Sequence, residues 1–144
     1  MDWLDILMVE DNGGDVVLLD EAFARTGIAH RVHVATDGVE ALAYLRRQGP
    51  YADAPRPDVI VLDLKMPRKG GREVLAELLP DTDLQAIPVV VLSSSQSELE
   101  LIKHQVPAEH CIAKPFSFEG YLQIARFIGS LGRPATGQGA GARP

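Results

Sequence analysis

The sequence predicts one α/β domain in which a parallel sheet is covered by helices on both faces. Strand-like runs alternate five times with segments whose apolar residues recur at the 3.6-residue period of a helix, which is typical of parallel sheets. Three of the runs, at residues 6–9, 59–62 and 87–92, are apolar almost throughout, so we expect them in the buried middle of the sheet. A chain of 144 residues is long enough to bury a full core.

Each remaining element has a recognisable pattern or boundary. Residues 31–34 alternate polar and apolar side chains, which suits an edge strand, and the fifth strand is short, at 111–113. Asp37 and Ser95 each stand three residues before a glutamate, the spacing of a helix capping box, and we expect Ser117 to cap the last helix. The apolar faces of the five helices are marked in turn by Val16, Leu19, Ala22 and Phe23; Leu42 and Leu45; Val74, Leu75 and Leu78; Leu99, Leu101 and Ile102; and Phe118, Tyr121, Leu122, Ala125 and Ile128.

The composition limits the classes of protein to which the chain can belong. A net charge of −6 and a pI near 5.1 argue against a nucleic-acid partner, for which a basic surface is expected. A single cysteine cannot form an internal disulfide and fits a reducing compartment. No apolar run approaches the roughly 18 residues needed to cross a bilayer. We therefore expect a cytoplasmic protein without a membrane partner.

The C-terminal end has a different composition from the rest of the chain. From Gly132 onward the chain consists of Gly, Ala, Pro, Thr, Gln and Arg, so it offers almost no apolar side chains to bury. We therefore predict a domain at residues 1–131 and a flexible tail at 132–144, with no DNA-binding or catalytic domain after it.

Polar residues follow four of the predicted strands. Glu10 and Asp11 follow the first strand, Asp63 the third, Ser93 the fourth and Lys114 the fifth. Ligands of open parallel sheets bind beyond the carboxyl ends of the strands, so these groups are expected to meet there. Three close carboxylates repel one another at neutral pH, and Mg²⁺ neutralises such a group with one or two carboxylates, waters and phosphate oxygens. The pattern predicts a metal site with a phosphate as its remaining ligand.

The other two groups suit the phosphate. The Lys114 ammonium offers a compact positive charge to phosphoryl oxygens, and the Ser93 hydroxyl can donate a hydrogen bond to one of them. The Asp63 carboxylate could accept a phosphoryl group, as aspartates do in other proteins that form acyl phosphates. The four histidines show no metal-ligand spacing, and we expect them to be surface residues without a role.

These motifs resemble those of a known family. Residues 9–12, residues 62–67 with Gly71, residues 92–95 and residues 114–116 match, in order and in spacing, the receiver domain of two-component response regulators. The resemblance covers roughly residues 4 to 131. It implies a flavodoxin-like (βα)5 fold whose five parallel strands lie in the order 2-1-3-4-5.

The resemblance assigns a metal and a phosphoacceptor. Asp63 would accept the phosphoryl group. Asp11 and Asp63 would bind Mg²⁺ or Mn²⁺, with the backbone carbonyl of Lys65 as a further ligand and Glu10 holding a metal-bound water.

The resemblance also assigns the groups that respond to phosphorylation. Ser93 would be the switch hydroxyl, Lys114 would pair with Asp63 and then with the phosphoryl group, and Ser94 would contribute through its backbone. The side chains of Lys65 and Ser95 would tune hydrolysis of the acyl phosphate.

The sequence departs from the family pattern at three places, one of which is the switch hydroxyl, Ser93, where threonine is commoner. Cys111 occupies the position, three residues before the lysine, at which the family often has a switch aromatic. Residues 105–110 lack the usual Gly-Ala, so we expect a short or displaced fourth helix. The bond between Lys114 and Pro115 is commonly cis in the family, and we expect the same here.

The predicted function is that of a single-domain response regulator that is not otherwise an enzyme. A sensor histidine kinase would phosphorylate Asp63, and the output would be a protein–protein contact, a homodimer through the fourth and fifth helices, or a phosphorelay. Residues 9–12 and 91–95 resemble regulators that are paired with bacterial phytochromes. Two alternatives are an aspartate-nucleophile phosphatase or phosphotransferase, which would need an acid where Lys65 stands, and a pseudo-receiver that binds partners without being phosphorylated.

Overall fold

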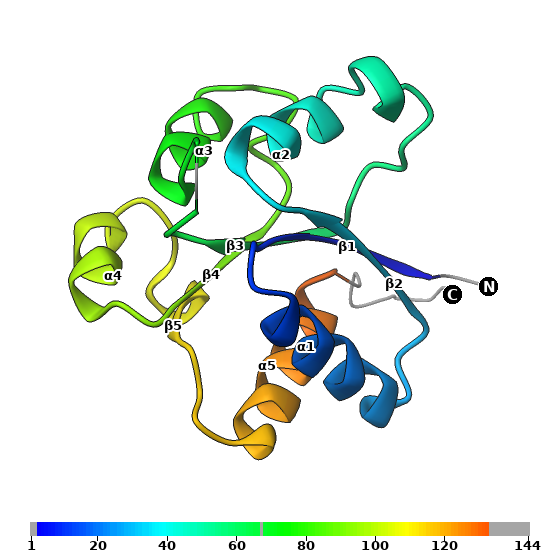
Figure 1. Cartoon of the computed structure of the whole chain (residues 1–144), viewed down its shortest axis with the longest axis vertical. Helices are drawn as coiled ribbons and strands as arrows, with labels where there is room; N and C mark the ends of the chain where they lie inside the picture. The colour runs from blue at the N-terminus through cyan, green and yellow to red at the C-terminus, as the bar shows by residue number, and fades with distance from the viewer. Residues whose placement is uncertain (1–2, 67, 133–144) are drawn as a thin grey trace.

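A computed structural model describes residues 3–66 and 68–132 of the chain. Strands and helices alternate along these residues as predicted (Figure 1). The strands are β1 (Leu4–Val9), β2 (His30–Ala35), β3 (Val59–Asp63), β4 (Val89–Ser93) and β5 (Cys111–Ala113). The helices are α1 (Gly13–Thr26), α2 (Gly38–Leu45), α3 (Gly71–Leu78), α4 (Gln96–Ile102) and α5 (Phe118–Gly132), and short 3-10 turns occur at Gly49–Tyr51 and Ala108–His110.

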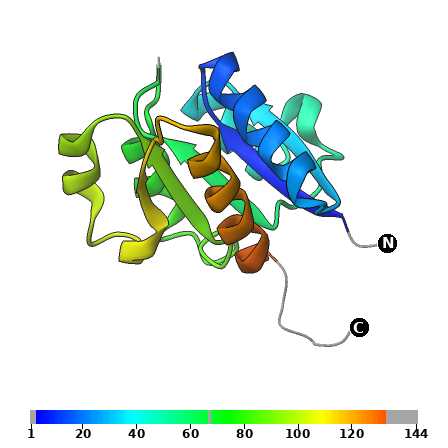
Figure 2. The same cartoon turned by 90° about the horizontal axis from the view of Figure 1, so that it is seen from below.

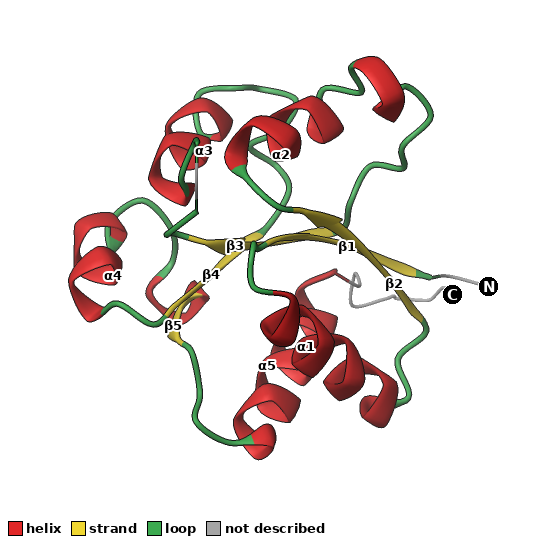
Figure 3. Cartoon of the chain, in the orientation of Figure 1, coloured by secondary structure: helices red, strands yellow, loops and turns green. Residues whose placement is uncertain are grey.

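The five strands form one parallel sheet in the order β2-β1-β3-β4-β5, which confirms the order that the resemblance implied. Helices α1 and α5 cover one face, and α2 and α3 cover the other (Figures 1 and 3). All residues of β1, β3 and β4 are buried, whereas the edge strands β2 and β5 are largely half-buried. The alternation and the solid apolar runs therefore predicted both the layers and the central strands.

Each face of the sheet has its own apolar core. Leu19 and Phe23 of α1 pack with Ile124 and Ile128 of α5 beneath the sheet. Figure 2 shows these two helices side by side on the face turned toward the viewer. The opposite core receives side chains from α2, α3 and α4. Helix α4 has only seven residues, so the prediction of a short fourth helix is confirmed.

The predicted caps begin the helices. Ser95 Oγ accepts a hydrogen bond from Glu98 N at 3.3 Å, and Ser117 Oγ accepts one from Gly120 N at 3.2 Å. Asp37 Oδ1 accepts a hydrogen bond from Glu40 N at 2.8 Å. The α5 helix ends at Gly132, and residues 133–144, most of the predicted tail, lie outside the described residues. Within the described part of the chain, no helix has the length and apolarity that a bilayer crossing needs.

Candidate functional site

Three carboxylates meet where β1 and β3 end. The pairing of Val9 with Leu62 places the residues after β1 beside the end of β3. Glu10, Asp11 and Asp63 each offer a carboxylate oxygen, and these oxygens lie within 4.8 Å of one another. Glu10 and Asp63 are buried, with 2% and 6% of their surface exposed, whereas Asp11 is exposed. The structure therefore brings together the three acids that the sequence predicted, with one of them open to solvent.

The acids carry more negative charge than their surroundings neutralise. Burial, and then the charge of Asp63, raise the pKa of Glu10 to about 7, although the Lys114 ammonium opposes this change. Burial also raises the pKa of Asp63, again against the effect of Lys114. Lys114 brings one positive charge to a cluster of three carboxyl groups, Glu10, Asp11 and Asp63. A divalent cation with oxygen ligands would supply the missing charge, so the residues present fit a Mg²⁺ or Mn²⁺ ion.

Lys114 lies among the acids and contacts an additional one. Its Nζ is 2.7 Å from Asp15 Oδ2, 3.0 Å from Glu10 Oε1 and 3.7 Å from Asp63 Oδ1. Burial alone would lower the pKa of Lys114, but the hydrogen bonds to Asp15 and Glu10 raise it above its ordinary value, so the side chain is charged. The sequence placed Lys114 correctly.

Asp15 is the site residue that the sequence interpretation missed. It stands in the first turn of α1, three residues after Asn12, whose Oδ1 accepts a hydrogen bond from Asp15 N at 3.1 Å. An acid in the first turn of a helix is commonly explained by the helix dipole alone. Its position one turn after Glu10 and Asp11 was the available signal that it could reach the same site.

Ser93 ends β4 on the other side of Asp63. Leu92 pairs with Asp63, and the carbonyl of Ser93 accepts a hydrogen bond from Lys114 N at 3.0 Å. The Ser93 side chain is buried, and its hydroxyl oxygen accepts a hydrogen bond from Ser95 N at 3.1 Å. The hydroxyl proton is therefore available for another acceptor. Ser94 is exposed beside it.

The loop after Asp63 is held close to the sheet by two glycines. Gly71 N donates to Leu64 O at 3.1 Å, and Gly38 N donates to Lys69 O at 2.8 Å. A Cβ at Gly71 would overlap the carbonyl oxygen of Asp63, so a side chain at this position would push α3 away from the phosphoacceptor candidate. Lys65 has an exposed side chain, and its backbone N–H is one of the groups that lower the pKa of Asp63.

Cys111 begins β5 and is half-buried against the core on the α2–α3 side. Burial raises the pKa of its thiol, which fits a small apolar residue better than a reactive one. The expected cis bond between Lys114 and Pro115 is wrong, since the described residues include no cis peptide bond. An X–Pro bond favours trans by about 0.5–1 kcal/mol unless packing demands the other isomer.

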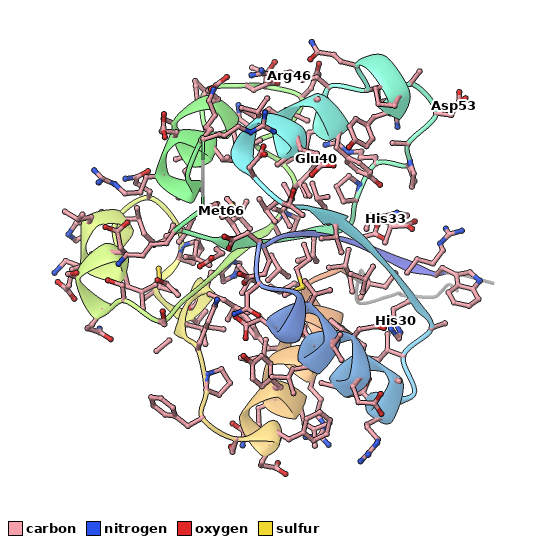
Figure 4. All side chains as sticks on the ribbon, in the orientation of Figure 1. His30, His33, Glu40, Arg46, Asp53 and Met66 are labelled. Atoms are coloured by element: carbon pink, nitrogen blue, oxygen red, sulfur yellow. The ribbon has the colours of Figure 1, made fainter. Side chains whose placement is uncertain are left out.

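The expectation that all four histidines are surface residues is wrong for three of them. His30, His33 and His110 are half-buried, and each uses a ring nitrogen in a hydrogen bond of 3.1 Å or less. His104 is exposed. Figure 4 shows His30 and His33 beside β2, away from Met66 in the loop that follows Asp63. These hydrogen bonds serve packing at the edges of the sheet, which a linear pattern does not reveal.

Comparison with known proteins agrees with this geometry. The family model described as "Response regulator receiver domain" matches residues 6–126. The chain belongs to this family. It is 46% identical over 97 residues to the response regulator Rcp1 of a Synechocystis strain, an alignment that covers 67% of this chain and 66% of that protein. The chain thus spans a little under two thirds of that relative's length.

Solved structures of receiver proteins have the same fold. The phosphorylated cyanobacterial phytochrome response regulator RcpA superposes with a TM-score of 0.76 at 44% identity, covering 88% of this chain and 91% of that one. The Mn²⁺-bound form of Rcp1 superposes with a TM-score of 0.77 at 35% identity, covering 95% of this chain and 99% of that one. The flavodoxin-like receiver fold is therefore confirmed.

Proposed function

We propose that this receiver accepts a phosphoryl group on Asp63 from a sensor histidine kinase and signals through the resulting change of surface. The observation that carries the proposal is the position of Asp63. Its buried carboxylate ends a central strand, with Lys114 Nζ at 3.7 Å and two further carboxylates within reach of a shared cation. An acid in such a place is suited to be a nucleophile whose product is stabilised by positive charge.

The cation in this proposal is Mg²⁺ or Mn²⁺. Asp11 and Asp63 would hold it directly, the backbone carbonyl of Lys65 would be a third protein ligand, and Glu10 would hold a bound water. When bound, the ion supplies positive charge to the phosphoryl oxygens. The Mn²⁺-bound form of Rcp1 supports this choice of metal by similarity.

In the proposed transfer, a lone pair on a carboxylate oxygen of Asp63 forms the new P–O bond. The P–N bond of a phosphohistidine breaks, and its electron pair remains on the imidazole nitrogen of the donor. Lys114 offsets charge on the phosphoryl oxygens during this step, because its ammonium is already charged and close to Asp63.

Ser93, Lys114 and the backbone of Ser94 would then bind the phosphoryl group of the product. Binding by these groups would shift a pre-existing equilibrium between inactive and active forms. The proposal includes no aromatic switch residue, because Cys111 stands at the position where the family often has one. The side chains of Lys65 and Ser95 would tune the lifetime of the acyl phosphate. Substitution of both without a change in that lifetime would contradict this part.

The partner and the output are proposed by similarity. RcpA is a cyanobacterial phytochrome response regulator, which supports a phytochrome-type kinase as the phosphoryl donor of this chain. A homodimer through α4 and α5, or a phosphorelay, would carry the output. A cytoplasmic location belongs to the same proposal, and the free thiol of Cys111 is consistent with it.

Treatment with acetyl phosphate and Mg²⁺, followed by intact mass, tests the proposal. We expect the wild-type protein to gain the mass of one phosphoryl group and Asp63→Asn to gain none. Equal spectra for the two proteins under conditions that preserve acyl phosphates would contradict it and favour a pseudo-receiver. Turnover of phosphomonoesters would favour a phosphatase, although Lys65 stands where that chemistry needs an acid.

A further inference from the structure

The Lys114 ammonium is shared by three carboxylates at unequal distances. Asp15 Oδ2 is nearest at 2.7 Å and Glu10 Oε1 follows at 3.0 Å. Asp63 Oδ1 is at 3.7 Å, which is beyond a normal hydrogen bond. In the form that the structure describes, Lys114 is therefore bound by Asp15 and Glu10 rather than by the phosphoacceptor candidate.

The contact between Asp15 and Lys114 is protected from solvent. The two side chains have 20% and 14% of their surface exposed, so their attraction is screened less than that of an open surface pair. Asp15 is fixed in the first turn of α1, where Asn12 caps its backbone N–H and the helix dipole favours its negative charge. The backbone of Lys114, directly after β5, is held by the hydrogen bond from its N–H to Ser93 O at 3.0 Å, so only rotation of its side chain can carry the ammonium away from Asp15.

We propose that Asp15 is a positioning residue that keeps the Lys114 ammonium beyond hydrogen-bond distance of Asp63 in the unphosphorylated protein and competes with the phosphoryl group for it. This inference rests on the proposed phosphorylation of Asp63. Phosphorylation then exchanges one charge-assisted contact of Lys114 for another. Asp15 would set how strongly the unphosphorylated form resists that exchange.

Asp15 also connects Lys114 with α5. Tyr121 of α5 is buried, and its pKa is raised by burial and then by the charge of Asp15. Helices α1 and α5 pack against each other along this face (Figure 2). Departure of the ammonium from Asp15 would change the charge that Tyr121 faces. This gives the protein a response to phosphorylation that does not need an aromatic residue at Cys111.

Beryllofluoride, which mimics a phosphoryl group on a carboxylate, provides the first test. In the presence of Mg²⁺, we expect Asp15→Asn to bind beryllofluoride about threefold to tenfold more tightly than wild type, because a neutral amide competes less well than a carboxylate for Lys114. Glu21→Gln is the matched control, since it removes one negative charge from an exposed part of the same helix. It should bind as wild type does. An unchanged or weaker affinity of Asp15→Asn would overturn the inference.

Removal of a negative charge near the site could also raise the affinity for beryllofluoride without any contact to Lys114. NMR of the wild-type protein distinguishes this general effect from the direct contact. The scalar coupling across the hydrogen bond between Lys114 Nζ and the Asp15 carboxylate should be detectable in the free protein and lost when beryllofluoride binds. A coupling that persists in the bound state, or that is absent in the free state, would overturn the inference without any variant. Asp15→Glu should partly restore the wild-type affinity, because it returns a carboxylate to the first turn of α1.

The proposed function and this inference fail in different ways. If the wild-type protein gains no phosphoryl group from acetyl phosphate, the proposed function fails and the inference fails with it. If the wild-type protein is phosphorylated but Asp15→Asn behaves as wild type and as Glu21→Gln, only the inference fails.

Discussion

Glu10 should destabilise the metal-free protein at neutral and alkaline pH, and its replacement by glutamine should remove that cost. Burial and the neighbouring Asp63 raise the pKa of Glu10 from its ordinary value of 4.5 to about 7. Between these two values the folded protein holds a proton that the unfolded chain has lost. Stability therefore falls as the pH rises through this window and stays low above it.

The size of the effect follows from the same two values. At about 1.4 kcal/mol per pKa unit, the difference between 4.5 and about 7 corresponds to about 3 kcal/mol of unfolding free energy. Glu10→Gln keeps the shape and an acceptor for the Asn12 N–H, which now donates to Glu10 Oε2 at 3.3 Å. The variant should therefore be more stable than wild type by up to about 3 kcal/mol at pH 8, and by less than about 1 kcal/mol at pH 5, where only the start of the window has been crossed.

Urea denaturation in the presence of a chelator measures this difference at both pH values. Glu21→Gln removes an exposed carboxylate and should change stability by less than about 0.5 kcal/mol at either pH. Addition of Mg²⁺ should stabilise wild type more than Glu10→Gln, because the ion neutralises the charge that the variant lacks. An equal difference at pH 5 and pH 8, or a less stable variant at pH 8, would refute this reasoning.

Two further predictions concern the loops around the site. Gly71→Ala should lower the unfolding free energy measured by urea denaturation by about 1–3 kcal/mol, because the added Cβ overlaps the Asp63 carbonyl. Gly13→Ala is the control and should be nearly neutral, since its Cβ meets no atom within 4 Å. Equal losses of stability in the two variants would contradict the close approach at Gly71. Ser95→Ala should cost about 1 kcal/mol through the lost cap of α4, and hydrogen exchange should show faster opening at Glu98 N if that cap is the cause.

Much of the fold could be predicted because its signals are local. The solid apolar runs of β1, β3 and β4 identified the central strands, and the polar–apolar alternation of β2 identified an edge. The caps at Asp37, Ser95 and Ser117 lie within one turn of the groups they bind. Residues this close in sequence come into contact whenever the helix forms, so the sequence pattern alone is enough to predict the cap.

Predictions that depended on packing between elements were less successful. His33 was expected on the surface, but its ring contacts Asp5 of the neighbouring strand at 3.1 Å. The cis bond expected at Lys114–Pro115 came from the family and not from this chain's own packing. Neither outcome could be obtained without knowing which side chains lie opposite each other across the sheet or beside the loop.

The sequence alone determined which groups meet at the site. Glu10, Asp11, Asp63, Ser93 and Lys114 each end a strand or lie within two residues of its end, and parallel strands bring their carboxyl ends to one edge of the sheet whatever the details of packing. Only the tertiary structure decided which carboxylates Lys114 contacts. Its nearest partner is Asp15, 99 positions away in the chain, because the fold places the first turn of α1 beside the residue that follows β5.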